Sequence, residues 1–255
     1  MKTTTVYFSA TNTTRTVVST ITRTWQASTR NLNLTSAPIQ EDMLISSDEV
    51  LLVGMPVYGG RIPNVAVESL KHLKGKHTPV VLVAVYGNRE FEDALVEMQD
   101  LMEANGFFVM AAGAFVAQHS IFPHTAKGRP DAADLDKIKD FAKRCQELIN
   151  QGFSLDAQSV KLPGNRPYKT PGNIPLQVKT SSKCSECGTC IKVCPTQAIP
   201  VDNPHRTDAS LCIHCGRCIY VCPEQARHYG GLLYTVAGGI FGWKNRVRKE
   251  PEFFF

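Results

Sequence analysis

The sequence lacks the segments that direct a protein to a membrane or across one. Its first residues, MKTTTVYFSATNTT, contain no basic stretch followed by an apolar segment and a small-residue cleavage site. The longest apolar run near the C-terminus, residues 230–243, is too short and too rich in glycine to span a bilayer. We therefore expect a cytoplasmic protein that is not anchored in a membrane.

Two nucleotide-binding signatures are also absent. The chain contains neither G-x-x-x-x-G-K-[ST], the loop of nucleotide triphosphatases, nor G-x-G-x-x-G, the dinucleotide fingerprint. Apolar residues make up 43% of the chain and charged residues 20%, which is typical of a globular protein rather than a disordered one. At 255 residues, such a chain has room for two unequal domains.

The placement of cysteine carries the strongest signal. Eight of the nine cysteines form two copies of one pattern, C-x2-C-x2-C-x3-C-P, and the second copy begins 28 positions after the first. The first copy contains Cys184, Cys187, Cys190 and Cys194, and the second contains Cys212, Cys215, Cys218 and Cys222. Three thiolates on a tight loop can hold three corners of one 4Fe-4S cluster, while the fourth points away. Structural zinc would need two pairs of ligands, which leaves the third cysteine and the proline unexplained.

Over residues 183–228 this duplicated pattern resembles bacterial two-cluster ferredoxins. The resemblance implies two 4Fe-4S clusters, with the fourth cysteine of each copy serving the other cluster. One cluster would then be held by Cys184, Cys187, Cys190 and Cys222, and the other by Cys212, Cys215, Cys218 and Cys194. The positive charge lies in residues 156–255, which hold 13 Lys and Arg against 7 Asp and Glu, but four-thiolate clusters carry offsetting negative charge. We therefore expect no nucleic-acid partner.

The first 150 residues alternate between strand-like and helix-like patterns, which predicts a parallel sheet with helices on both faces. The expected strands are apolar runs rich in β-branched and aromatic residues, at 4–8, 50–55, 80–86 and 107–117, with a weaker one near 32–34. Helical spacing of apolar residues appears over 91–102 and 135–148. Cys145 lies on the second of these stripes, where we expect a small buried hydrophobe.

A hydroxyl-rich turn follows the first expected strand. Residues 9–14 are Ser-Ala-Thr-Asn-Thr-Thr and lead into a helix. Hydroxyl and backbone N–H groups at the positive end of a helix dipole favour a bound phosphate. The same composition also caps a helix that holds no ligand, so both interpretations stay open here.

Further loops at the carboxyl ends of expected strands make the phosphate interpretation more specific. They are residues 56–63 (Pro-Val-Tyr-Gly-Gly-Arg-Ile-Pro), 86–89 (Tyr-Gly-Asn-Arg) and 118–120 (Gln-His-Ser), and open α/β sheets bind ligands at that edge. Residues 1–150 thereby resemble flavodoxins, and the whole chain is similar to the flavodoxin-ferredoxin fusion proteins of the EFR1-type family. The resemblance implies a doubly wound parallel sheet of order 2-1-3-4-5 and a second, smaller α+β ferredoxin-like domain.

The resemblance also implies bound FMN. The implied contacts are Ser9, Thr11, Asn12, Thr13 and Thr14 at the phosphate, and Pro56, Val57, Tyr58, Gly59, Gly60, Tyr86, Gly87, Asn88, Arg89 and His119 around the ring. The sequence departs from the family where Asn12 occupies a glycine-like position and where both ring loops lack tryptophan. The alternative is a domain that keeps the fold without flavin.

The expected domains are a flavodoxin-like FMN-binding domain (1–155), a proline-rich linker (156–178), a two-cluster ferredoxin domain (179–229) and an apolar, basic tail (230–255). We expect the tail to pack across both domains, and the alternative is an interfacial membrane anchor. The resemblance implies transfer of single electrons between two 4Fe-4S clusters and FMN, with low-potential redox proteins as donor and acceptor. A ferredoxin-fed flavin reductase, using Arg61 and Arg89 for an anionic substrate, and a redox sensor are the alternatives. No catalytic residue is assigned.

Overall fold

The N-terminal domain is built on a six-stranded sheet of order β10-β7-β6-β4-β1-β2. The computed structural model describes residues 1–153, 157–172 and 174–255. The five parallel strands are β1 (Lys2–Tyr7), β2 (Ser28–Asn33), β4 (Glu49–Pro56), β6 (Thr78–Tyr86) and β7 (Phe107–Val116). Counted along the chain, they have the expected order 2-1-3-4-5, which is that of a flavodoxin-like doubly wound sheet. Two short strands, β3 (Met43–Leu44) and β5 (Leu73–Lys74), pair separately with each other.

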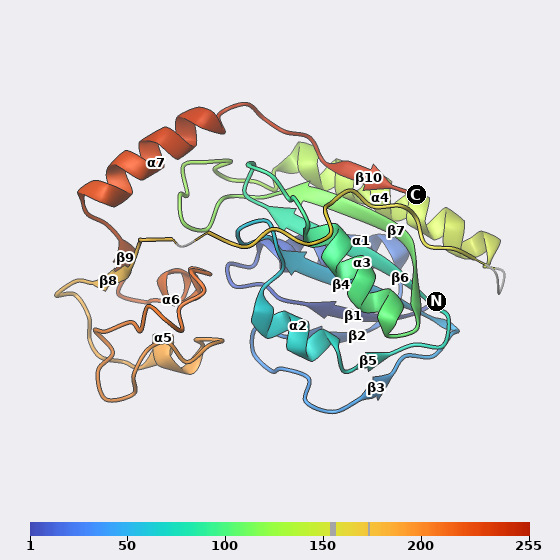
Figure 1. The fold of residues 1–255 in the computed structure, drawn as a ribbon, viewed down its shortest axis with the longest axis horizontal. Coiled ribbons are helices and arrows are strands. Elements are labelled where there is room, and N and C mark those ends of the chain that lie inside the picture. The colour runs from blue at the N-terminus through green and yellow to red at the C-terminus, as the bar shows by residue number, and fades with distance from the viewer. Residues whose placement is uncertain (154–156, 173) are drawn as a thin grey trace.

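Helices cover both faces of this sheet (Figure 1). One face packs against α1 (Thr13–Trp25) and α4 (Ala132–Gln151), and the other against α2 (Asn64–Leu70) and α3 (Ala94–Ala104). Because β4, β6 and β7 are buried on both faces, their sequences are continuous apolar runs, and this is why they were predictable. β2 lies at the sheet edge with a largely polar sequence, so only its last residues gave a signal.

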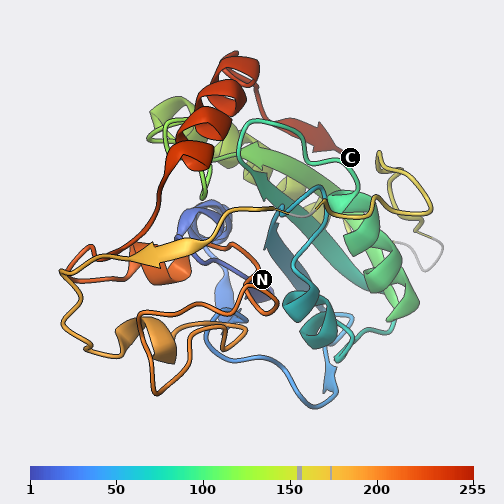
Figure 2. The same cartoon turned by 60° about the vertical axis from the view of Figure 1, so that its left-hand side comes forward.

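The ferredoxin-like domain consists mainly of loops. A two-stranded antiparallel sheet pairs β8 (Val178–Thr180) with β9 (Arg227–Tyr229), and two single-turn helices, α5 (Thr189–Lys192) and α6 (Arg217–Tyr220), follow the cysteine loops. Each of these helices begins after a glycine with positive φ, 71° at Gly188 and 74° at Gly216. Figure 2 shows this domain beside the carboxyl ends of the parallel strands.

The proline-rich linker lies against the N-terminal domain in its described part. The backbone N–H of Val160 donates to the carbonyl of Val109 at 2.9 Å. Further along, Asp93 accepts backbone N–H bonds from Asn165 at 2.8 Å and from Lys169 at 2.6 Å. These contacts fix where the chain enters the ferredoxin-like domain.

The C-terminal tail crosses from one domain to the other, as expected (Figure 1). It forms α7 (Leu232–Lys244) and an antiparallel edge strand, β10 (Glu252–Phe254), which pairs with β7. In α7 the Tyr234 hydroxyl donates to the Ile121 carbonyl at 2.9 Å. The opposite side of α7 exposes apolar side chains: Leu232, Val236, Ile240 and Trp243. Among the described residues, no helix has the length and apolar character needed to cross a membrane.

Candidate cofactor sites

The eight patterned thiols surround two separate hollows. The first hollow is lined by Cys184, Cys187, Cys190 and Cys222, and the second by Cys194, Cys212, Cys215 and Cys218. The fourth cysteine of each copy thus lies with the first three of the other copy, in the grouping that the ferredoxin resemblance implies. Within the described residues, no group of three His, Cys, Asp or Glu side chains is placed to hold a single metal ion.

The second hollow has the chemistry that an iron-sulfur cluster needs. Burial raises the pKa of Cys215 to about 12 and that of Cys218 to about 11, so these thiols lose their protons only beside positive charge such as iron. The Tyr229 hydroxyl and the His214 Nδ1 are buried without a protein partner, and both residues line this hollow. Thiolate and sulfide sulfurs would accept hydrogen bonds there.

Backbone donors complete the ligand loops. The N–H of Ala198 donates to the Cys194 sulfur at 3.3 Å, and the N–H of Ala226 donates to the Cys222 sulfur at the same distance. Hydrogen bonds of this kind stabilise thiolate charge and are part of how a protein sets a cluster's potential. The residues present therefore fit two 4Fe-4S clusters.

The hydroxyl-rich turn after β1 forms one wall of a third hollow. Asn12 caps α1 with φ 65°, a left-handed conformation that asparagine tolerates better than most residues, which explains its presence at a glycine-like position. Ser9 is occupied within the protein: its side-chain oxygen accepts the Arg15 N–H at 3.0 Å, and its own N–H donates to Thr35 at 2.6 Å. The neighbouring threonines are the hydroxyl residues of the turn that are left to contact a phosphate.

Most of the residues expected to contact FMN gather around two connected hollows. The hollow at the turn is lined by Thr11, Thr13, Thr14, Pro56, Val57, Tyr58, Tyr86, Gly87 and His119. Gly59 and Arg89 line a larger neighbouring chamber, which shares Val57, Tyr58 and His119 with the first. Four expected contacts line neither hollow: Ser9, Asn12, Gly60 and Asn88.

Two of these four residues hold other segments in place. The Asn88 side chain donates to the carbonyls of Asn245 at 2.8 Å and Val247 at 2.9 Å, so it anchors the C-terminal tail. Asn12 donates to the hydroxyl of Tyr220 at 3.1 Å and thereby joins the turn to the ferredoxin-like domain. A single sequence gives no sign of either contact, because the partners lie more than 150 residues away.

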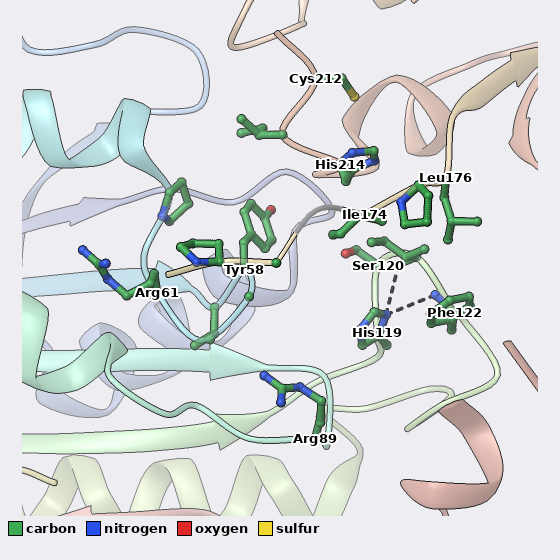
Figure 3. Close-up of a pocket in the computed structure, with 18 of the residues that line it drawn as sticks. Tyr58, Arg61, Arg89, His119, Ser120, Phe122, Ile174, Leu176, Cys212 and His214 are labelled. Carbon is green, nitrogen blue, oxygen red and sulfur yellow. Dashed lines mark hydrogen bonds between the residues drawn. The ribbon is translucent and has the colours of Figure 1, made fainter. Parts of the chain in front are cut away.

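The larger chamber lies between the two domains and has a volume of about 560 Å³. Figure 3 shows its walls: Tyr58, Arg89 and His119 come from the flavodoxin-like domain, and Cys212 and His214 come from the second cysteine loop. The linker closes it with residues 174–176, and α7 contributes Phe241. The ring loops and the second cysteine loop thus meet at this chamber, and the phosphate turn lines the neighbouring hollow that shares Val57, Tyr58 and His119 with it.

The two arginines of the ring loops are held in ion pairs. Arg61 makes a two-pronged contact with Glu97, at 2.7 Å from Nε and 2.6 Å from Nη2. Arg89 pairs with Glu92 at 3.0 and 2.7 Å. Their charge is therefore largely compensated, which weakens the idea that they hold an anionic substrate.

His119 is a neutral imidazole in this structure. Its Nδ1 accepts the backbone N–H groups of Ile121 at 3.2 Å and Phe122 at 3.1 Å, which leaves the proton on Nε2. Burial, assisted by the nearby Arg89 charge, lowers the pKa of His119 to about 4. The ring also contacts Phe241 of α7, with ring centroids 4.6 Å apart.

Sequence reasoning missed two residues that join the domains. Arg217 of α6 donates to the carbonyl of Ala10 in the phosphate turn at 3.1 Å, and Tyr220 of the same helix accepts from Asn12 at 3.1 Å. The turn expected to hold a phosphate is therefore covered by the second cysteine repeat.

Residues 183–226 match the family described as 4Fe-4S dicluster domain. No curated protein matches the sequence significantly. Solved structures that resemble the chain include a flavodoxin from Streptococcus pneumoniae TIGR4, which is 14% identical, with 59% of this chain and 99% of that one covered and a TM-score of 0.42.

Two further structures belong to the same group. A Fusobacterium nucleatum flavodoxin bound to flavin mononucleotide is 14% identical, with 58% of this chain and 99% of that chain covered and a TM-score of 0.40. A Bacillus anthracis azoreductase is 10% identical, with coverages of 56% and 100% and a TM-score of 0.41. By the strand order of its own sheet and by the matched family, this chain combines a flavodoxin-like domain with a 4Fe-4S dicluster domain.

Proposed function

We propose that this protein transfers single electrons between two 4Fe-4S clusters and FMN, and exchanges them with partner redox proteins. The observation that carries the proposal is the interdomain chamber, whose walls include Tyr58 beside the phosphate turn and Cys212 of the second thiol hollow. FMN, when bound, supplies both one-electron and two-electron chemistry, whereas each cluster supplies single electrons. A shared chamber would hold the flavin and a cluster at a short, fixed distance from each other.

The residues of the flavodoxin-like domain would bind and shield the flavin. Thr11, Thr13 and Thr14, at the N-terminus of α1, would hold the phosphate through hydroxyl and backbone N–H groups. Tyr58 lies where the phosphate hollow opens into the chamber and would contact the ring. His119 would donate a hydrogen bond from its Nε2–H group while remaining neutral.

The two thiol sets differ in exposure, which suggests the order of transfer. Each set has one buried member, Cys190 in the first and Cys215 in the second, but the first set also has an exposed member, Cys187, whereas Cys212 of the second borders the chamber. A low-potential partner would therefore exchange electrons with the first cluster, and the second cluster would connect it to the flavin. We favour this carrier over a reductase of an anionic substrate because Arg61 and Arg89 are already paired with glutamates.

Analysis of anaerobically prepared protein tests the proposal. We expect about eight iron, eight sulfide and one FMN per chain. A Thr11→Ala/Thr13→Ala variant should lose most of its FMN and keep its iron. The matched control is Thr22→Ala/Thr24→Ala, because those hydroxyls donate to helix carbonyls at the other end of α1.

Stopped-flow reduction then tests the transfer itself. With limiting reductant, iron-sulfur absorbance should bleach first, and flavin reduction should follow at a rate independent of protein concentration. A rate that rises in proportion to concentration would mean that electrons pass between molecules, and the shared chamber would then have no role in transfer. Protein that binds zinc in place of iron, or no FMN, would contradict the cofactor assignment.

A further inference from the structure

A buried arginine separates the two otherwise similar cysteine repeats. Residues 184–198 recur 28 positions later as residues 212–226, and the next residue is Ile199 in the first copy but Arg227 in the second. Both side chains are buried, with 3% of Ile199 and 2% of Arg227 exposed. One copy therefore places an apolar group, and the other a permanent positive charge, at equivalent positions.

No carboxylate among the described residues forms a salt bridge with Arg227. Nη1 donates to the carbonyl of Pro204 at 2.6 Å, and Nη2 donates to the side chain of Thr207. Nε is buried without a protein partner. A guanidinium cannot shed its proton, so burying one without a counter-charge is strongly unfavourable unless negative charge lies nearby.

The guanidinium of Arg227 lies beside the cysteine ligands. Arg227 lines the first thiol hollow, and its Nη1 lies 4.0 Å from the sulfur of Cys190. A four-thiolate cluster is anionic and becomes more so on reduction, which would supply the missing counter-charge.

We propose that Arg227 is a fixed cation at the first cluster site, where it stabilises the reduced cluster and so raises its reduction potential. The inference rests on the proposed two-cluster function. A purely structural role is the competing explanation, because Arg227 also ties the loop around Pro204 and Thr207 to β9. The two roles predict different reduction potentials, because the potential depends on the charge of the residue at position 227 and not on its shape alone.

The test uses three full-length variants that are loaded with clusters anaerobically and analysed for iron. Arg227→Gln removes the charge but keeps an amide donor, Arg227→Lys keeps the charge, and Arg206→Gln removes the charge of an exposed arginine in the same domain. Midpoint potentials are measured by redox titration with electron paramagnetic resonance. This signal reports the clusters directly and needs no partner enzyme.

We expect Arg227→Gln to lower at least one midpoint potential so that the ratio of reduced to oxidised cluster falls about tenfold at a fixed potential, equivalent to about 59 mV. Arg227→Lys should retain most of the wild-type value, and Arg206→Gln should change little because solvent and salt screen an exposed charge. Equal potentials in wild type and Arg227→Gln would overturn the proposal, as would an equal fall in the Gln and Lys variants.

Cluster loading is informative in the same samples. If Arg227→Gln loses iron while Arg227→Lys keeps it, the charge is required for assembly, which supports the proposal. If both variants lose iron equally, the site requires the shape of arginine and the electrostatic role is wrong. Wild-type protein that lacks iron would instead contradict the two-cluster function, so failure of the function and failure of this inference are distinguishable.

Discussion

The crossed grouping of the thiols leads to a prediction about which cysteine serves which cluster. Replacing Cys184 and Cys187 with alanine removes two of the four thiols of the first hollow and none of the second. Iron should fall from about eight to about four per chain, because each cluster holds four iron atoms. In this double variant, the effect of each further substitution on the remaining cluster can then be measured.

In this background, the two fourth-position cysteines should have opposite effects. Adding Cys222→Ala should leave about four iron, because Cys222 lines the hollow that is already disabled. Adding Cys194→Ala should damage the remaining cluster, because Cys194 lines the hollow of Cys212, Cys215 and Cys218. Iron analysis measures the loss, and electron paramagnetic resonance identifies which signal disappears.

The opposite pattern would refute the structural reasoning. If Cys222→Ala destroys the remaining cluster and Cys194→Ala spares it, each copy ligates its own cluster and the hollows are misassigned. Far-UV circular dichroism and thermal melting provide a control for folding in every variant, because FMN content also depends on the second cysteine repeat that covers the phosphate turn. A variant that loses its cooperative melting transition together with its iron would indicate general unfolding rather than loss of a ligand.

Two further predictions concern stability. Phe253→Ala should lower the free energy of unfolding of the flavodoxin-like domain by about 2 kcal/mol, roughly half the value for a fully buried phenylalanine, because Phe253 contacts Phe115 and Phe141 at centroid distances of 5.6 and 5.1 Å. Trp243→Ala, on the exposed side of α7, should change this free energy by less than about 0.5 kcal/mol. If denaturant melts show the same loss of stability in both variants, the packing of the tail is contradicted. The pKa of His119 is about 4 in the folded protein, below the 6.5 of an unfolded histidine, so protonation favours unfolding. The free energy of unfolding should therefore decrease as the pH is lowered from 6.5 to 4, by up to about 1.4 kcal/mol per pH unit. A His119→Asn variant keeps an acceptor for the two backbone N–H groups and should lose that part of the slope, and an unchanged pH profile would show that His119 is not a buried neutral imidazole.

The parts of this protein that were predictable from sequence are those encoded by local patterns. Cysteine spacing within a loop of a few residues defines a ligand set almost irrespective of the surroundings, so the ferredoxin-like domain was identified from it, and the match over residues 183–226 agrees. Strands buried on both faces leave continuous apolar runs, so β4, β6 and β7 were predicted. The edge strand β2 has no such constraint, and its signal was correspondingly weak.

For several residues of the candidate flavin site, the structure shows side-chain contacts that the sequence did not indicate. Ser9 and Asn88 belong to loops with the right position and composition, yet their side chains are used to brace the turn and to anchor the tail. The alternative reductase hypothesis used Arg61 and Arg89 for an anionic substrate, but each finds a glutamate within hydrogen-bonding distance. A loop sequence specifies which polar groups are available, but it does not specify which residues those groups contact in the folded protein.

The sequence by itself predicted the eight thiols as ligands and determined the parallel sheet and the hydroxyl-rich turn, because each depends on residues that are close along the chain. Only the tertiary structure decided that α6 covers the phosphate turn and that the second cysteine loop shares a chamber with Tyr58 and His119. It also placed the terminal phenylalanines on both faces of the sheet as part of an added strand. These features depend on contacts between segments far apart in sequence, whose formation is governed by how the surfaces of the two domains fit and not by any local pattern.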